Sequence, residues 1–174
     1  MERTFDPVQL LAVLNKHGVR YVVVGGFAAL AHGSPLPTND VDVTPERSTA
    51  NLAALSDALS ELGARIRVAG IPDGLVFRHN ARSLADVTVL NLTTRLGELD
   101  LVMQPAGGRD YYALADHGLL VGLHGVPVTL ASLDDVIHSK EAAGREKDRL
   151  ALPVLRALQR RLDEQVERAV ETDS

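Results

Sequence analysis

The sequence predicts an α/β fold of the α+β kind, with a small mixed β-sheet flanked by helices and a C-terminal helical segment. Apolar or alternating runs that are typical of strands occur between residues 21 and 130. From residue 132 onward the chain is predicted to be helical, beginning with a capped run that carries an apolar stripe. Strands followed by helices favour a mixed sheet with a helical cap.

Length and composition agree with one domain. The chain has 174 residues, 45% hydrophobic and only 3% aromatic, so an aliphatic core is expected. We expect a single domain over residues 1–174, with the sheet and its helices in 1–131 and C-terminal helices in 132–170. The absence of cysteine excludes disulfides and thiolate chemistry. Because no apolar run approaches the ~20 residues of a membrane span and the N-terminus is polar, we expect a cytoplasmic protein without membrane contact.

Capping residues, apolar patterns and turn residues predict the individual elements. Helices are expected where a capping or turn residue precedes an apolar pattern: residues 6–17, 27–32, 49–62, 110–117 and 132 onward, with bends at Gly144 and Pro153. Strands are expected in residues 21–24, 39–43, 64–77, 86–93, 98–103 and 119–130. Turns between them are expected at residues 72–74, 80, 95–97 and 124–125.

The segment 21–43, YVVVGGFAALAHGSPLPTNDVDV, carries the clearest chemistry. Its first strand ends in Gly25-Gly26, where no Cβ keeps a ligand from the backbone, and the N–H groups can point at phosphate oxygens. In the next strand Asp40 and Asp42 alternate with valines, so both carboxylates lie on one face. Two adjacent carboxylates repel each other unless a cation lies between them. Oxygen ligands of this kind suit Mg²⁺ that bridges to substrate phosphates.

A strand, Gly-Gly, a short helix, a turn and D-x-D, in this order, resemble the nucleotidyltransferase superfamily related to DNA polymerase β. The resemblance implies a sheet of that type and transfer of a nucleotide from a nucleoside triphosphate (NTP). It also implies two divalent metal ions, Mg²⁺ or alternatively Mn²⁺, held by Asp40 and Asp42. Gly25, Gly26 and Thr38 would then contact the NTP.

A third carboxylate is generally supplied by a later strand in this superfamily. The run ELDLVM at residues 98–103 offers Glu98 and Asp100 on one face of the second strand of a predicted hairpin. An acid flanked by apolar residues is costly unless it is paired or coordinates a metal, which favours Asp100 as a catalytic metal ligand or general base. Glu98 is the alternative.

A second motif begins at Ser139. The pattern S-K-x-A-A-G-R-x-K-D resembles that of the AbiEii and MenT-like nucleotidyltransferase toxins. This resemblance implies that Lys140 is catalytic and binds the triphosphate, with Arg145 and Lys147 beside it. Asp148 would orient the triphosphate or the basic residues. Without the upstream D-x-D, the same run would be interpreted as a helix surface of mixed charge.

Charge is distributed unevenly along the chain. A net charge of −5 argues against broad nucleic-acid binding. Residues 140–161 contain seven basic and three acidic side chains, which is +4 and leaves −9 for the remainder. This basic segment either guides an RNA end or the triphosphate, or is a solvated helix face.

The resemblance leads to a functional hypothesis with two alternatives. We expect a Mg²⁺-dependent nucleotidyltransferase that modifies the 3′ end of tRNA and acts as the toxin of a toxin–antitoxin pair, with a cognate antitoxin as partner. The first alternative is a small-molecule nucleotidyltransferase that modifies an aminoglycoside or lincosamide, and the second is a non-catalytic nucleotide-binding protein. A drug acceptor calls for an acidic or aromatic pocket, so the basic segment favours RNA, and the intact D-x-D favours catalysis.

Overall fold

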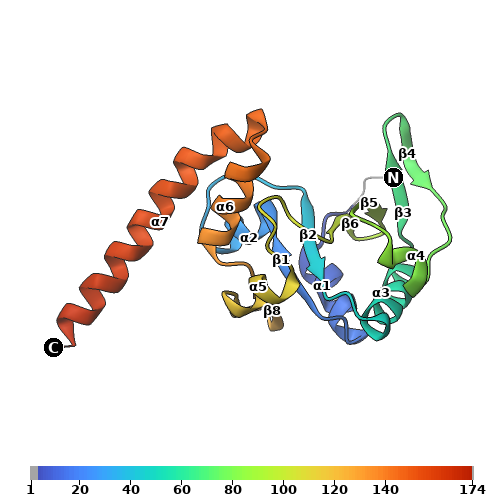
Figure 1. Ribbon diagram of the computed structural model, residues 1–174, viewed down its shortest axis with the longest axis horizontal. Coiled ribbons are helices and arrows are strands. Elements are labelled where there is room, and N and C mark those ends of the chain that lie inside the picture. The colour runs from blue at the N-terminus through green and yellow to red at the C-terminus, as the bar shows by residue number, and fades with distance from the viewer. Residues whose placement is uncertain (1–3, 174) are drawn as a thin grey trace.

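The computed structural model describes residues 4–173 as an eight-stranded mixed β-sheet with helices packed around it (Figure 1). The strands are β1 Tyr21–Val24, β2 Asp40–Pro45, β3 Arg65–Val68, β4 Ile71–Leu75, β5 Val89–Thr94, β6 Gly97–Val102, β7 Leu119–Leu123 and β8 Val126–Leu130. The helices are α1 Pro7–Lys16, α2 Gly25–Ala31, α3 Thr49–Glu61, α4 Ala81–Ala85, α5 Tyr111–Asp116, α6 Leu133–Ala143 and α7 Glu146–Thr172. These elements confirm the predicted fold class.

The strand that carries D-x-D lies in the middle of the sheet. The strand order is β4-β3-β5-β6-β2-β1-β8-β7, with β2 antiparallel to β1 and parallel to β6. The predicted hairpin is β5 and β6, which are antiparallel from Val89 opposite Val102 to Thr94 opposite Gly97. A central strand is held by hydrogen bonds on both edges, so its side chains are presented with little freedom. The sheet therefore provides a rigid support for β2 side chains.

The core is aliphatic, as the composition predicts. On one face of β2 and β6, the inward residues Val41, Val43, Leu99 and Leu101 have no exposed surface. Leucines of α1 and α3 complete this core, among them Leu10, Leu14, Leu52, Leu55 and Leu59. Because side chains alternate along a strand, the acids of β2 and β6 must lie on the opposite face.

The C-terminal segment consists of two helices joined at a glycine. Gly144 adopts a left-handed conformation with φ of 61° and ends α6, as expected. Pro153 does not interrupt α7, which continues for 27 residues and extends away from the sheet (Figure 1). Within residues 4–173, no helix combines the length and the apolar character needed to cross a membrane.

One predicted turn is wrong. Residues 72–74 lie inside β4, and the chain reverses instead at Ala69-Gly70, where Gly70 has φ of 79°. Gly74 serves close packing rather than a turn, since a Cβ at this position would lie 2.6 Å from the carbonyl oxygen of Ile66. Pro72 is tolerated because β4 is an edge strand. The turn predicted at Asn80 is the N-cap of α4, a short helix that the sequence pattern did not reveal.

Candidate active site

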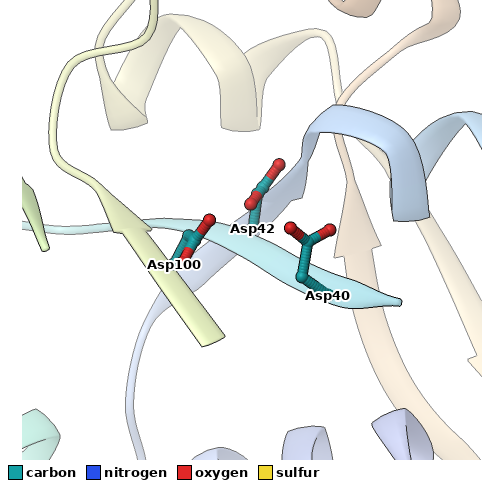
Figure 2. A group of neighbouring side chains, drawn as sticks. All are labelled: Asp40, Asp42 and Asp100. Carbon is teal, nitrogen blue, oxygen red and sulfur yellow. The ribbon is translucent and has the colours of Figure 1, made fainter. Parts of the chain in front are cut away.

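Three carboxylates meet on the face of the sheet opposite the aliphatic core (Figure 2). Asp40 and Asp42 come from β2, and Asp100 comes from β6, where it lies directly opposite Asp42 in the parallel register. One oxygen of each carboxylate lies within 4.8 Å of one oxygen of the other two. The three acids could therefore bind a divalent metal ion, whose preferred ligands are carboxylate oxygens.

Glu98 lies on the same face of β6 as Asp100 but outside the acidic cluster. It lies opposite Asp40 in the β2–β6 register, yet it belongs to no such carboxylate cluster among the described residues. The guanidinium of Arg67 from β3 contacts Glu98 and donates from Nη2 to Oδ1 of Asp100 over 2.7 Å. Sequence reasoning missed Arg67, because β3 and β6 are distant in sequence and become neighbours of β5 only in the folded sheet. Of the two sequence candidates, the geometry brings Asp100 to the aspartates.

The acidic cluster brings three carboxylates together. Burial, and then the charges of Asp40 and Asp100, raise the pKa of Asp42 to about 7, although Lys147 and Lys140 act in the opposite direction. Burial also raises the pKa of Asp100, despite the ion pair with Arg67. A bound cation would relieve both penalties, because it attracts the ionised form of each carboxylate. The electrostatics of the cluster thus fit a metal site.

Gly25, Gly26 and Thr38 lie against the acidic cluster. Gly25 has φ of 67°, and a Cβ on it would lie 2.1 Å from Oδ2 of Asp42. A Cβ on Gly26 would lie 3.3 Å from Oγ1 of Thr38. The Thr38 hydroxyl donates to Oδ1 of Asp40 over 3.1 Å. Gly25 therefore lets Asp42 approach the start of α2, and the Thr38 hydroxyl orients the carboxylate of Asp40.

A cavity of about 680 Å³ opens beside the cluster. Most of the predicted site residues line it: Gly25, Gly26, Thr38, Asp40, Asp42, Asp100, Lys140, Arg145 and Lys147. Its volume is within the range of about 300–1,000 Å³ that is usual for small-molecule sites. Within the described chain, no aromatic side chain lines this cavity. The cavity thus combines an acidic end with a basic wall that α6 and α7 provide.

Asp148 does not line the cavity. Its side chain has no exposed surface and pairs with Nε of Arg145 at 2.7 Å and with Nζ of Lys140 at 3.5 Å. Although burial opposes ionisation, hydrogen bonds and charge from Arg145, with a smaller contribution from Lys140, lower the pKa of Asp148. Its hydrogen bond to Arg145 raises the pKa of that guanidinium. The structure therefore places Asp148 behind the two basic residues.

Known proteins resemble this chain in structure but not in sequence. No family model matches the chain, and no curated protein sequence matches it. The lincosamide antibiotic adenylyltransferase LnuA with bound lincomycin has a TM-score of 0.59 and 14% identity, and the match covers 90% of this chain and 99% of LnuA. ANT(2″)-Ia in complex with adenylyl-2″-tobramycin has a TM-score of 0.54 and 17% identity, with 94% and 95% covered.

A third solved structure comes from Thermotoga maritima and is described as that of a nucleotidyltransferase. Its TM-score is 0.53 and its identity 16%, with 94% of this chain and 98% of the other chain covered. These similarities extend over nearly the whole of each chain. The chain has the nucleotidyltransferase fold.

Proposed function

We propose that the protein is a Mg²⁺-dependent nucleotidyltransferase. The observation that carries this proposal is the convergence of Asp40, Asp42 and Asp100 within 4.8 Å beside a cavity with basic residues on another wall. Nucleotide transfer from an NTP requires carboxylates that bind metal ions. It also requires nearby cations that bind the phosphates. The fold of the solved relatives supports this reaction class.

In the proposed reaction, a hydroxyl oxygen of the acceptor attacks the α-phosphorus of the NTP, and the bond to pyrophosphate breaks. Bound Mg²⁺ would supply positive charge at the attacking and leaving oxygens. Asp40, Asp42 and Asp100 would hold the metal ions, and Asp100 would act as a metal ligand or as the general base that accepts the hydroxyl proton. The pyrophosphate carries away the negative charge of the leaving oxygen.

The basic wall binds the triphosphate in this proposal. Lys140, Arg145 and Lys147 all line the cavity, so these three cations are the ones proposed to bind the phosphates. The buried carboxylate of Asp148 holds Lys140 and Arg145 through its ion pairs, so it acts as a positioning residue. On the opposite side, Gly25, Gly26 and Thr38 would contact the NTP, and the Thr38 hydroxyl also donates a hydrogen bond to Asp40.

The acceptor we favour is RNA, with the 3′ end of tRNA as the specific target and a toxin role that a cognate antitoxin neutralises. Two observations support this choice. The motif from Ser139 to Asp148 resembles that of the AbiEii and MenT-like toxins. Residues 140–161 also carry a net charge of +4, which suits an RNA acceptor better than a drug.

A second candidate is transfer to a small-molecule acceptor. It is favoured by the fold similarity to LnuA and ANT(2″)-Ia, whose structures hold lincomycin and an adenylylated tobramycin. The two candidates share the same proposed metal site and differ in the acceptor. The remaining alternative is a protein that binds a nucleotide but does not catalyse its transfer.

The test incubates the protein with Mg²⁺ and each α-labelled NTP in turn, with total tRNA in one series and a panel of lincosamides and aminoglycosides in another. The Asp42→Asn variant is the inactive control, and Asp57→Asn, an exposed acid on α3, is the matched control. We expect label in tRNA with wild type and Asp57→Asn only. Label on a drug would replace the RNA proposal, and label on neither acceptor with any NTP would contradict both.

A further inference from the structure

The guanidinium of Arg67 is the positive group in direct contact with the acidic cluster. Among the basic side chains of residues 4–173, it alone forms an ion pair with one of the three clustered aspartates. Its Nη2 lies 2.7 Å from Oδ1 of Asp100, and its Nη1 pairs with Oε2 of Glu98. One planar guanidinium therefore holds two carboxylates of β6 at once, which suits the forked donors of arginine.

Strand register brings Arg67 to β6. Arg65 of β3 is opposite Thr93 of β5, and Thr93 is opposite Glu98. Because side chains alternate along a strand, Arg65 and Arg67 share the face of the sheet that carries Glu98 and Asp100. The side chain of Arg67 crosses β5, which lies between β3 and β6. With 27% of Arg67 and 15% of Asp100 exposed, this pair is more confined than an ordinary surface ion pair.

Arg67 lies behind Asp100 as seen from the cavity. Asp100 lines the cavity of the proposed function, whereas neither Arg67 nor Glu98 is among the described residues that line it. A substrate in the cavity therefore meets the carboxylate of Asp100 and not the guanidinium. An effect of Arg67 on transfer must act through the carboxylate that it holds.

The charge of Arg67 is coupled to the cluster. Burial acts to lower the pKa of Arg67, yet the carboxylates of Asp100, Glu98 and Asp40 raise it. The same attraction offsets part of the repulsion between the acids. A divalent cation bound by these acids would face the guanidinium as a like charge, and like charges at close range repel strongly in a partly buried site.

We propose that Arg67 is a positioning residue that orients Asp100 for nucleotide transfer and at the same time opposes metal binding by the acidic cluster. This inference rests on the proposed function. The hydrogen bond from Arg67 is made to Oδ1 of Asp100, which leaves Oδ2 for a metal ion or for the acceptor proton. The two effects have different origins, because the forked donors hold the carboxylate whereas the positive charge competes with the metal ion for it.

Two substitutions at residue 67 separate these effects. Arg67→Met removes both the charge and the fork, so it should tighten Mn²⁺ binding about tenfold by calorimetry and lower kcat about tenfold at saturating Mg²⁺. The KM for the NTP should stay unchanged, because the basic wall is not altered. Arg67→Lys keeps the charge without the fork, so Mn²⁺ affinity should match the wild type while kcat stays reduced. A residue that only stabilises the fold would not weaken metal binding.

A double variant tests whether Arg67 acts through Asp100. In single-turnover assays, Arg67→Met added to Asp100→Asn should lower the rate no further, whereas two independent residues would multiply their effects. Arg65→Met is the matched control. It removes an arginine from the same face of β3, where Arg65 donates to the backbone carbonyl oxygen of Asp73. This control should leave Mn²⁺ affinity and kcat unchanged, and thermal unfolding confirms that each variant is folded.

Three results would each overturn the role of Arg67. They are Mn²⁺ affinity in Arg67→Met that is equal to or weaker than that of the wild type, a kcat that neither substitution at residue 67 changes, and a further fall in rate in the double variant. Failure of the proposed function is distinguishable from these results. A wild type that transfers no label to any acceptor would overturn that function, while the Mn²⁺ titrations need no NTP and still decide whether Arg67 opposes metal binding.

Discussion

The Cα of Gly25 lies so close to the carboxylate of Asp42 that a Cβ on residue 25 would be 2.1 Å from Oδ2. Asp42 lies on β2, and Gly25 is the first residue of α2, directly after Val24 of β1, which is opposite Asp42. Contact at this distance is impossible for any side chain, and φ of 67° adds a second reason for glycine. Glycine at position 25 is thus required both by the acidic cluster and by the backbone conformation at the start of α2.

Gly25→Ala should therefore remove metal binding. The added methyl group must displace Asp42 or α2, so we expect a large loss of Mn²⁺ affinity measured by calorimetry. Gly18→Ala is the matched control, because Gly18 has φ of 71° but nothing within 4 Å of its Cβ position. It should cost about 1 kcal/mol of stability from the backbone alone and leave Mn²⁺ affinity unchanged. Equal Mn²⁺ affinity in both variants would contradict the close contact.

The stability of the metal-free protein should fall as pH rises toward 7. The pKa of Asp42 is raised from 3.8 to about 7, so between these values the folded protein retains a proton that the unfolded chain releases. The stabilising effect of this proton is complete below about pH 4 and is lost as pH passes through 7. Thermal unfolding in EDTA should show this slope, and Asp42→Asn should flatten it.

Metal binding should have the opposite dependence on pH. A divalent cation binds the ionised carboxylate, so Mg²⁺ affinity should increase as pH rises through about 7, the pKa of Asp42. Calorimetric titrations with Mg²⁺ at pH values on either side of 7 measure this change. A Mg²⁺ affinity that does not vary over this range would show that Asp42 is not a ligand.

Asp148→Asn should destabilise the protein. The substitution leaves Arg145 and Lys140 without the carboxylate that pairs with both. We expect a loss on the order of 2–3 kcal/mol, below the value for a fully buried pair because Arg145 is partly exposed. Denaturant unfolding measures it, and Asp163→Asn, an exposed acid on the same helix, should change stability by less than about 0.5 kcal/mol. A mild effect of Asp148→Asn would argue against its positioning role.

Glu98 and Asp100 should differ in their importance for transfer. Asp100 is only 15% exposed and lies in the acidic cluster, whereas Glu98 is 39% exposed and contacts Arg67. We expect Asp100→Asn to lower kcat at least about a hundredfold and Glu98→Gln to lower it less than about tenfold. Single-turnover assays with labelled NTP distinguish them, and the reverse order would make Glu98 the third carboxylate.

Local pattern was sufficient to predict most elements of the fold. Period two in D-V-D-V placed both aspartates on one face, and capping residues predicted the starts of α1 and α6. The wrong turn at residues 72–74 has a tertiary cause. Gly74 is required by the approach of Ile66 from the neighbouring strand, and a local pattern cannot distinguish this use of glycine from a turn.

The sequence by itself determined the residue types of the candidate site, because D-x-D and the motif from Ser139 to Asp148 are each a short, continuous stretch of the chain. Only the tertiary structure decided which of these residues meet. It set Asp100 opposite Asp42, brought Arg67 to Asp100 and buried Asp148 beneath Lys140. The reason is that strand register and helix packing depend on residues that are far apart in sequence, so a short stretch of sequence does not determine them.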